Sequence, residues 1–274
     1  MFDYHVHSEF SNDIPKGKGS TVRELCLKAI ELGIEDLAIT DHYDIDGCLD
    51  GYFVPLDFEN ERKAVFEAKE EFKDKLNVVV GLELGQPIHK LKESDELLKK
   101  YDFDVLLGSV HAVYGIEDFS EADIKSFSKN ERIKLWEDYL KEFVETVNWA
   151  KQDIVTHITY PKRYYLKNGI SDFPDIKNKG REYFEPILKA VIDKNLALEC
   201  NTSGLRQIMG ECLPNEDLLR FYYDLGGRDI SIGSDAHNAR DVAANFKETR
   251  EMLLNIGFKN VVRYKNREKY YGKL

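Results

Sequence analysis

The chain has 274 residues, of which 42% are hydrophobic, and 50 acidic residues against 39 basic ones give it a formal net charge of −11. This composition is typical of a globular protein that buries a full core, and the length suits one domain over residues 1–274. The negative charge disfavours nucleic acid as a partner, because like charges repel at long range, although bound cations would reverse the field at a site.

Four cysteines are scattered along the chain without a C-x-x-C pair: Cys26, Cys48, Cys200 and Cys212. In a chain of this length they are typical of reduced thiols in the cytoplasm. The first predicted strand begins at Phe2, which leaves no room for a signal peptide, and no apolar run reaches the length of a membrane span. We therefore expect a cytoplasmic protein with no membrane partner, and the sequence leaves its oligomeric state open.

Seven short apolar runs predict strands that are buried on both faces. They are "FDYHV" (2–6), "DLAIT" (36–40), "NVVVG" (77–81), "DVLLG" (104–108), "DIVTH" (153–157), "LALEC" (196–200) and "DISIG" (229–233). Helical periodicity predicts helices between them, over 21–32, 59–76, 128–147, 179–195, 215–226 and 239–256. The first and third of these open on capping boxes, at Thr21 and Ser128. Alternation of strands and helices predicts a parallel sheet, either a barrel or a doubly wound fold.

Two histidines lie side by side at the end of the first predicted strand. Side chains of a strand point alternately to opposite faces, so His5 and His7 share one face with Val6 between them. A single histidine on such a face is more often a hydrogen-bonded core residue than a ligand. A pair at this spacing favours metal binding, but the pair alone is a modest signal.

Further histidines and carboxylates follow the other predicted strands. They are His42, Glu83, His111, His157, Asp235 and His237. Because the carboxyl ends of parallel strands meet on one face, where such folds build their sites, we expect these side chains to converge. Any one of them could be a core or capping residue, but that interpretation does not explain their common edge.

The number of candidate ligands exceeds what one ion takes from a protein, since a catalytic zinc ion usually has three protein ligands. Two or three divalent ions that share a bridging carboxylate fit the set better. Imidazole and carboxylate ligands without thiolate suit Zn, Mn or Fe(II), and the sequence does not choose among them.

Six motifs at the strand ends resemble, in order, those of the PHP (polymerase and histidinol phosphatase) superfamily. They are "HVH" (5–7), "TDH" (40–42), "GLELG" (81–85), "GSVH" (108–111), "THI" (156–158) and "GSDAH" (233–237). The opening "YHVHSEFSND" is most similar to the histidinol-phosphate phosphatase branch. The resemblance implies an α/β fold, a distorted (β/α)7 barrel with a trinuclear metal site at the carboxyl ends of its strands.

The resemblance also implies a ligand set for each ion. The first ion would take His5, His7, Glu83 and Asp235; Glu83 would bridge to a second with His111 and His157; the third would take His42 and His237. Many relatives have a further histidine shortly after the first pair, where this chain has Asp13. Asp13 can serve as a ligand, or it can be a loop or helix-capping residue.

A multimetal site suits phosphoester hydrolysis, because the ions activate water and neutralise charge on the phosphoryl oxygens. Arg163 is the first candidate for binding the phosphate and Arg206 the second, since a guanidinium binds two oxygens at once. Either arginine could instead lie on the surface. The general acid would be Asp235 or a water on the metal, and His111 is expected to be essential for turnover.

The remaining substrate contacts are less defined by the sequence. Asn201 and Ser203 follow the strand end that lacks a ligand and could bind substrate or cap a turn. The long connections 112–127 and 158–178 are predicted to form the pocket wall. Within the first, Glu117 or Asp118 could pair with an ammonium group or be exposed. His89 lies away from the strand ends and is predicted to be exposed.

The leading hypothesis is a metal-dependent phosphatase of L-histidinol phosphate in histidine biosynthesis, with a small phosphomonoester as its partner. A PHP enzyme of other specificity is the alternative: a nucleotide phosphatase, a phosphotyrosine phosphatase or a nuclease. The last is disfavoured by the acidity and the missing basic stripe. A third possibility is a non-catalytic protein whose metal cluster is only structural. The presence of a suitable residue at every expected ligand position argues against it. Amidohydrolase barrels also begin with His-x-His, but their strand-four lysine has no counterpart after "DVLLG".

Overall fold

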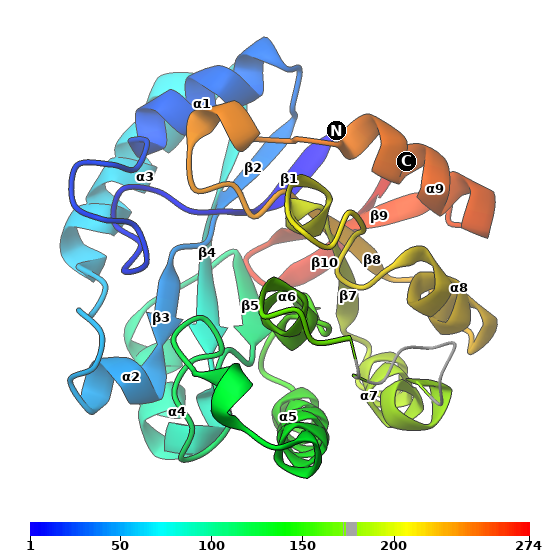
Figure 1. The fold of residues 1–274 in the computed structure, drawn as a ribbon. Helices are drawn as coiled ribbons and strands as arrows, with labels where there is room; N and C mark the ends of the chain where they lie inside the picture. Colours follow the sequence, from blue (N-terminus) through cyan, green and yellow to red (C-terminus); the bar gives the residue numbers. More distant parts are fainter. Residues whose placement is uncertain (172, 174–179) are drawn as a thin grey trace.

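The computed structural model describes residues 1–171, 173 and 180–274, and its main feature is a sheet of parallel strands wrapped by helices (Figure 1). The strand order is β1-β2-β4-β5-β6-β7-β8, with β3 also paired to β4. Their bounds are β1 Phe2–Val6, β2 Asp36–Ile39, β3 His42–Asp44, β4 Asn77–Gly85, β5 Val105–Ser109, β6 Ile154–Val155, β7 Ala197–Asn201 and β8 Ile230–Gly233. All seven predicted strands are confirmed, and every pair among them is parallel.

The two outer strands of this order, β1 and β8, meet and nearly close the sheet into a barrel. Val6 forms a parallel bridge with Ala236 just beyond β8. The His7 amide donates to the Ala236 carbonyl at 2.9 Å, and the Asp235 amide donates to the His5 carbonyl at 2.8 Å. The barrel expected from the family resemblance is therefore confirmed, and its closure brings "HVH" against "GSDAH".

The barrel is distorted where its second strand breaks. β2 pairs with the first half of β4, and after an interruption at Thr40 and Asp41 the chain pairs again, as β3, with the second half. The Asp41 carboxylate accepts hydrogen bonds from the Ser8 amide and hydroxyl, which fixes the break to the chain beyond β1. The break was not predicted, and it places His42 beside Glu83 in the register of β3 and β4.

Helices cover the outside of the barrel (Figure 1). The longer ones are α1 Val22–Glu31, α3 Phe58–Phe72, α4 Leu91–Lys100, α5 Lys129–Trp149, α7 Arg181–Asp193, α8 Glu216–Asp224 and α9 Phe246–Ile256. Both predicted capping boxes are present. The helix predicted over 239–256 begins only at Phe246, because Ala243 and Asn245 have positive φ angles that interrupt it. No helix in the described part of the chain is long and apolar enough to cross a membrane.

Two short helices lie beyond the carboxyl ends of the strands: α2 Ile45–Leu49 and α6 Pro161–Lys167. α6 occupies part of the connection that was predicted as a long loop. Residues 172 and 174–178 of that connection lie outside the described residues.

A C-terminal hairpin, which the sequence reading did not predict, lies at the amino ends of the strands. It consists of β9 Asn260–Lys265 and β10 Glu268–Lys273, which are antiparallel. The Arg263 guanidinium donates to both carboxylate oxygens of Asp36, the first residue of β2, at 2.6 Å each. Lys269 pairs with Asp229, which directly precedes β8. The hairpin therefore ties together the ends of the strands opposite to the predicted metal site.

Candidate metal centre

Glu83 lies at the centre of the histidine cluster, and its side chain is completely buried. Its Oε1 lies 2.9 Å from Nε2 of His157 and 3.2 Å from Nε2 of His111. Its Oε2 lies 2.9 Å from Nε2 of His5, 3.2 Å from Nδ1 of His42 and 3.4 Å from Nε2 of His7. Each carboxylate oxygen thus faces a different set of imidazoles, which is the arrangement that a bridging ligand requires.

Asp235 faces the same cluster from the loop after β8. Its Oδ1 lies 3.3 Å from Nε2 of His7 and 3.9 Å from Nε2 of His5. Its Oδ2 accepts hydrogen bonds from the Ser203 hydroxyl at 3.0 Å and the Asn201 amide at 3.3 Å. Asp235 has φ +53°, a backbone conformation that is strained for a residue with a side chain and that is common at functional sites.

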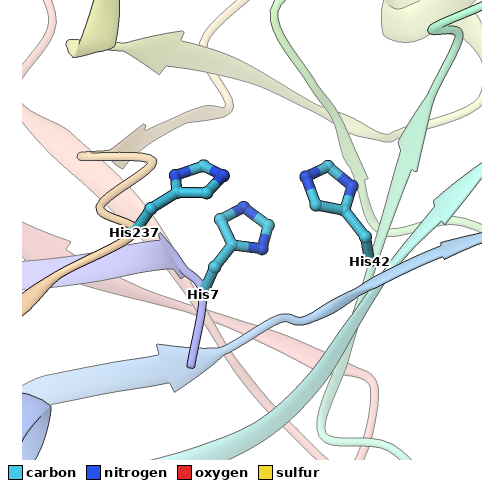
Figure 2. Close-up of side chains that lie close together, drawn as sticks. All are labelled: His7, His42 and His237. Atoms are coloured by element: carbon cyan, nitrogen blue, oxygen red, sulfur yellow. The ribbon is translucent and has the colours of Figure 1, made fainter. Parts of the chain in front are cut away.

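A third group of imidazoles lies at the outer side of the cluster. Figure 2 shows the rings of His7, His42 and His237 gathered around a common space. The ring centroids of His7 and His42 are 4.3 Å apart, and those of His7 and His237 are 4.4 Å apart. Oδ2 of Asp13 lies 2.6 Å from Nε2 of His237 and 3.8 Å from Nε2 of His42. The structure therefore brings Asp13 to the cluster together with the other eight predicted ligands.

Several buried ring nitrogens of the cluster have no hydrogen-bond partner among the described residues: Nε2 of His7, Nδ1 of His42 and Nδ1 of His157. A buried polar atom without a partner is costly, and a bound cation would remove that cost. Four overlapping sets of three side chains offer ligand atoms within 4.8 Å of one another. They are His5, His7 and Asp235; His42, Glu83 and His111; His7, His42 and His237; and His5, His157 and Glu199. The residues fit divalent metal ions, with imidazole and carboxylate donors and no thiolate.

The charges of the cluster also suit cations. Burial and the imidazoles of His42 and His237 lower the pKa of His7 to about 3, which keeps it in the neutral form that binds metal. Burial alone would raise the pKa of Glu83, but the surrounding histidines, His42 first, hold that pKa well below its usual value. Glu83 is therefore ionised in the barrel interior.

Sequence reasoning missed two carboxylates that contact the cluster. Asp44 Oδ1 lies 2.7 Å from Nδ1 of His111, and Glu199 Oε1 lies 2.6 Å from Nδ1 of His5. A signal was present for each. Asp44 stands two residues after His42, so it shares that side of an extended segment, and Glu199 is the only charged residue in the strand "LALEC".

Arg163 lies in the first turn of α6 and lines the cavity above the cluster. Its guanidinium packs on the rings of Tyr160 and Tyr164, and Nη2 donates to the Ser203 hydroxyl at 2.9 Å. Its Nε is buried without a hydrogen-bond partner among the described residues. Nη2 also lies 3.8 Å from Oδ2 of Asp235. The guanidinium places a positive charge beside a cavity of about 440 Å³, which is otherwise lined mainly by the histidines and acidic groups of the cluster.

A second cavity, of about 640 Å³, adjoins the first. Phe53, Asp118 and Glu121 line both, so they mark the junction. Glu117, Tyr52 and Tyr114 belong to the second cavity only. The connection beginning at residue 112 thus contributes to the walls of both cavities, as predicted.

One predicted position differs from its sequence-based interpretation, and a second lies away from both cavities in the described part of the chain. His89 is half-buried in the wall of the second cavity, with 4% of its side chain exposed, and Asp46 and Glu142 bind its two ring nitrogens at 2.6 and 2.8 Å. The prediction of an exposed residue was wrong. Arg206 donates to the Ser234 carbonyl at 2.7 Å and does not line either cavity in the described part of the chain. Its contact with substrate stays a prediction.

A family model, the PHP domain, matches residues 3–203 of the chain. Relatives of similar length match almost from end to end. A probable histidinol-phosphatase of Clostridium acetobutylicum is 28% identical, with 98% of this chain and 99% of the relative covered. A probable histidinol-phosphatase of Thermotoga maritima is 30% identical, with 94% and 93% covered.

The same likeness holds for solved structures. The histidinol phosphate phosphatase of Lactococcus lactis subsp. lactis, in a crystal structure with zinc, L-histidinol and phosphate, superposes with a TM-score of 0.81. It is 25% identical, and 98% of each chain is covered. A solved structure from Listeria monocytogenes, 20% identical with 90% of this chain and 99% of that chain covered, has the same fold with a TM-score of 0.71. The matched motifs, the barrel and the metal-binding geometry agree with one another: the chain belongs to the PHP domain family.

Proposed function

We propose that this protein is a metal-dependent phosphatase that hydrolyses L-histidinol phosphate to L-histidinol and phosphate. The observation that carries the proposal is the buried cluster around Glu83, whose two oxygens face separate sets of imidazoles at the floor of a cavity. The likeness to an enzyme of Lactococcus lactis that binds zinc, histidinol and phosphate supports the choice of substrate. The free thiols of all four cysteines suit the cytoplasm, where we place the enzyme as one domain over residues 1–274.

The proposed ligand sets follow the geometry of the cluster. His5, His7, Glu83 and Asp235 would hold one ion; Glu83, His111 and His157 a second; His42 and His237, with Asp13, a third. Two or three divalent ions fit, with zinc as the first candidate and manganese or iron as alternatives. When bound, the ions would lower the pKa of water and neutralise charge on the phosphoryl group.

The phosphate group would bind beside Arg163. Its guanidinium is fixed by stacking on Tyr160 and by the hydrogen bond to Ser203, so little side-chain freedom remains to be lost when an anion binds. Ser203 and Asn201 also hold Asp235, and they connect the arginine to the cluster. Nearby imidazoles, His5 first, overcome the effect of burial and hold the pKa of Asp235 well below its usual value, which suits a ligand better than a proton donor.

The alcohol part of the substrate would extend into the second cavity. Histidinol carries an ammonium and an imidazole, and this cavity offers carboxylates beside aromatic rings. Asp118 stands at the junction, where the Tyr160 hydroxyl donates to its carboxylate at 3.3 Å. We propose that Asp118, with Glu117 farther out, pairs with the ammonium group.

The proposal is tested by steady-state kinetics on L-histidinol phosphate, AMP, a phosphotyrosine peptide and an oligonucleotide. We expect kcat/KM to be highest for L-histidinol phosphate and to vanish after chelation. Equal or better turnover of another substrate would assign the protein a different phosphoesterase specificity. Full activity after stringent removal of metal would overturn the mechanism.

A further inference from the structure

We propose that Asp44 and Glu199 are positioning residues, each of which fixes one metal-binding histidine, and that the two glycines beneath them are required to make room for their carboxylates. The inference rests on the proposed function in taking the cluster to bind metal. It concerns residues to which neither the motifs nor the first assignment of ligands gave a role.

The first of the two arrangements is built from Asp44, Gly85 and His111. Asp44 is the last residue of β3 and lies opposite Gly85 in the register of β3 and β4. A Cβ atom on Gly85 would lie 2.0 Å from Oδ1 of Asp44, so this position admits no side chain while Asp44 stays in place. The same Oδ1 lies 2.7 Å from Nδ1 of His111, whose Nε2 lies 3.2 Å from Glu83 Oε1.

The second arrangement repeats this plan with Glu199, Gly233 and His5. A Cβ atom on Gly233 would lie 2.3 Å from Oε1 of Glu199 and 2.4 Å from Cβ of His5, so this glycine makes room for both partners of the contact. That oxygen lies 2.6 Å from Nδ1 of His5, whose Nε2 lies 2.9 Å from Glu83 Oε2. The other oxygen of Glu199 accepts from the His157 amide at 2.9 Å and from the Asn201 side chain at 3.2 Å, which fixes the carboxylate.

The two arrangements act on opposite oxygens of Glu83. A carboxylate that accepts the Nδ1 proton of a histidine fixes the ring orientation and leaves the Nε2 lone pair for a cation. Asp44 would therefore support the ion between Glu83 and His111, and Glu199 the ion between Glu83 and His5. The glycines of "GLELG" and "GSDAH" contribute by leaving space for these carboxylates.

The competing interpretation is that Glu199 is itself a ligand, because it also forms a possible metal-binding set with His5 and His157. The two interpretations differ in the state of the His5 ring. A positioning Glu199 requires a proton on Nδ1 of His5, and its loss would change where that proton resides. A ligating Glu199 makes no such demand.

The test compares zinc-loaded wild-type protein with Asp44→Asn and Glu199→Gln. Zinc content and zinc affinity are measured by elemental analysis and chelator competition, and the histidine tautomers by NMR of protein labelled with ¹⁵N-histidine. We expect each variant to bind one zinc ion about 10- to 100-fold more weakly, as for other residues that orient metal ligands. In the wild type we also expect a proton on Nδ1 of both His5 and His111. Asp44→Asn should lose the one on His111, and Glu199→Gln should lose the one on His5.

Asp153→Asn is the matched control, because Asp153 is a partly buried aspartate at the other end of the barrel and pairs with Arg267. Its zinc content should equal that of the wild type. Gly85→Ala should weaken zinc binding as Asp44→Asn does, and the double variant should be no weaker than either single one. Zinc affinities within twofold of the wild type, or unchanged tautomers in a variant that loses zinc, would overturn the positioning role. None of these readouts uses substrate, so failure of the proposed phosphatase activity would be recognised separately.

Discussion

The two ends of the barrel differ in whether their buried polar groups have partners. At the amino ends of the strands, four aspartates stand at or just before strands, and all contact the C-terminal hairpin: Asp36, Asp104, Asp153 and Asp229. Asp36 alone receives both arms of the Arg263 guanidinium and the hydroxyls of Tyr4 and Tyr270. At the carboxyl ends, buried ring nitrogens of three histidines lack a hydrogen-bond partner in the described part of the chain.

This difference separates stability from function. Paired buried charges hold strands together, whereas buried polar atoms without a partner are retained only where a ligand completes them. At the end that the hairpin covers, removal of any partner of a buried aspartate should therefore lower the stability of the protein. At the end that carries the cluster, substitutions should reduce activity more than stability. The following predictions test this division, from the largest expected effect to the smallest.

His111→Ala should abolish turnover. The change removes the proposed metal ligand that faces Oε1 of Glu83, and we expect kcat/KM to fall by about a thousandfold or more. The metal-free variant should stay folded, because residues at this face serve chemistry more than stability. Its free energy of unfolding should fall only by the loss of the buried contact between His111 and Asp44. Kinetics and urea unfolding monitored by circular dichroism measure both quantities. Unfolding of the variant would contradict the proposal that one end of the barrel serves function and the other serves stability.

Arg263→Ala should have the converse effect. Asp36 is completely buried, and removal of its guanidinium partner leaves a buried charge with only neutral donors. We expect the free energy of unfolding to fall by about 3 kcal/mol, at the lower end of the range for broken buried pairs because those neutral donors remain. Metal content and kcat should stay at wild-type values. Loss of metal in this variant would show that the two ends are coupled.

The sequence sufficed to predict the strands and the convergence of eight candidate ligands because these depend on local signals, whereas Asp13 was predicted only from the family resemblance. Buried parallel strands are continuous apolar runs, and a ligand at a strand end follows directly from the strand that carries it. The same reasoning failed for the hairpin. Its alternating polar residues, such as Arg263 and Lys269, have partners that lie far along the chain, and only the closed barrel brings them together.

The sequence also provided no indication of burial where a residue has polar neighbours along the chain. His89 looks like a surface residue because the sequence around it is charged, but Asp46 and Glu142 reach it from α2 and α5. Glu199 and Asp44 were missed for a related reason. Both carboxylates contact histidines from other strands, and the local signals that mark them do not show which histidine each one reaches.

Arg163→Ala should raise KM for L-histidinol phosphate by about 10- to 100-fold, since hydrogen bonds to charged groups contribute roughly 1.5–3 kcal/mol. Metal content should be unchanged. Nη2 of Arg163 lies 3.8 Å from Oδ2 of Asp235, but the Ser203 hydroxyl and the Asn201 amide still hold that oxygen when the guanidinium is removed. Arg163→Lys is the matched variant, and it should restore part of the affinity, since it keeps the charge but loses the planar fork. A normal KM in Arg163→Ala would exclude this residue from phosphate binding.

The smallest expected effect is a pH-dependent one at His89. This histidine is half-buried, and both of its ring nitrogens have carboxylate partners although it lies on the functional side of the barrel. Burial would lower its pKa, but hydrogen bonds with Asp46 and Glu142 outweigh that effect and raise the pKa to about 9. The Tyr114 ring packs edge-on against it, and the neighbouring Lys90 is engaged by Asp50. Below about pH 6.5 the histidine is charged in both the folded and the unfolded chain, so its contribution to stability is fully present there.

As the pH rises through about 9, the folded protein also loses this proton and the contribution disappears. Urea unfolding of the wild type and of His89→Gln should therefore give a difference on the order of 2 kcal/mol at pH 6 that shrinks toward zero near pH 10. Asp153→Asn serves as a control for the general effect of alkaline pH, since its partner Arg267 stays charged over this range. A difference between wild type and His89→Gln that is independent of pH would mean that His89 acts by packing alone. In that case the charge of His89 would not stabilise the protein as the paired charges at the hairpin do.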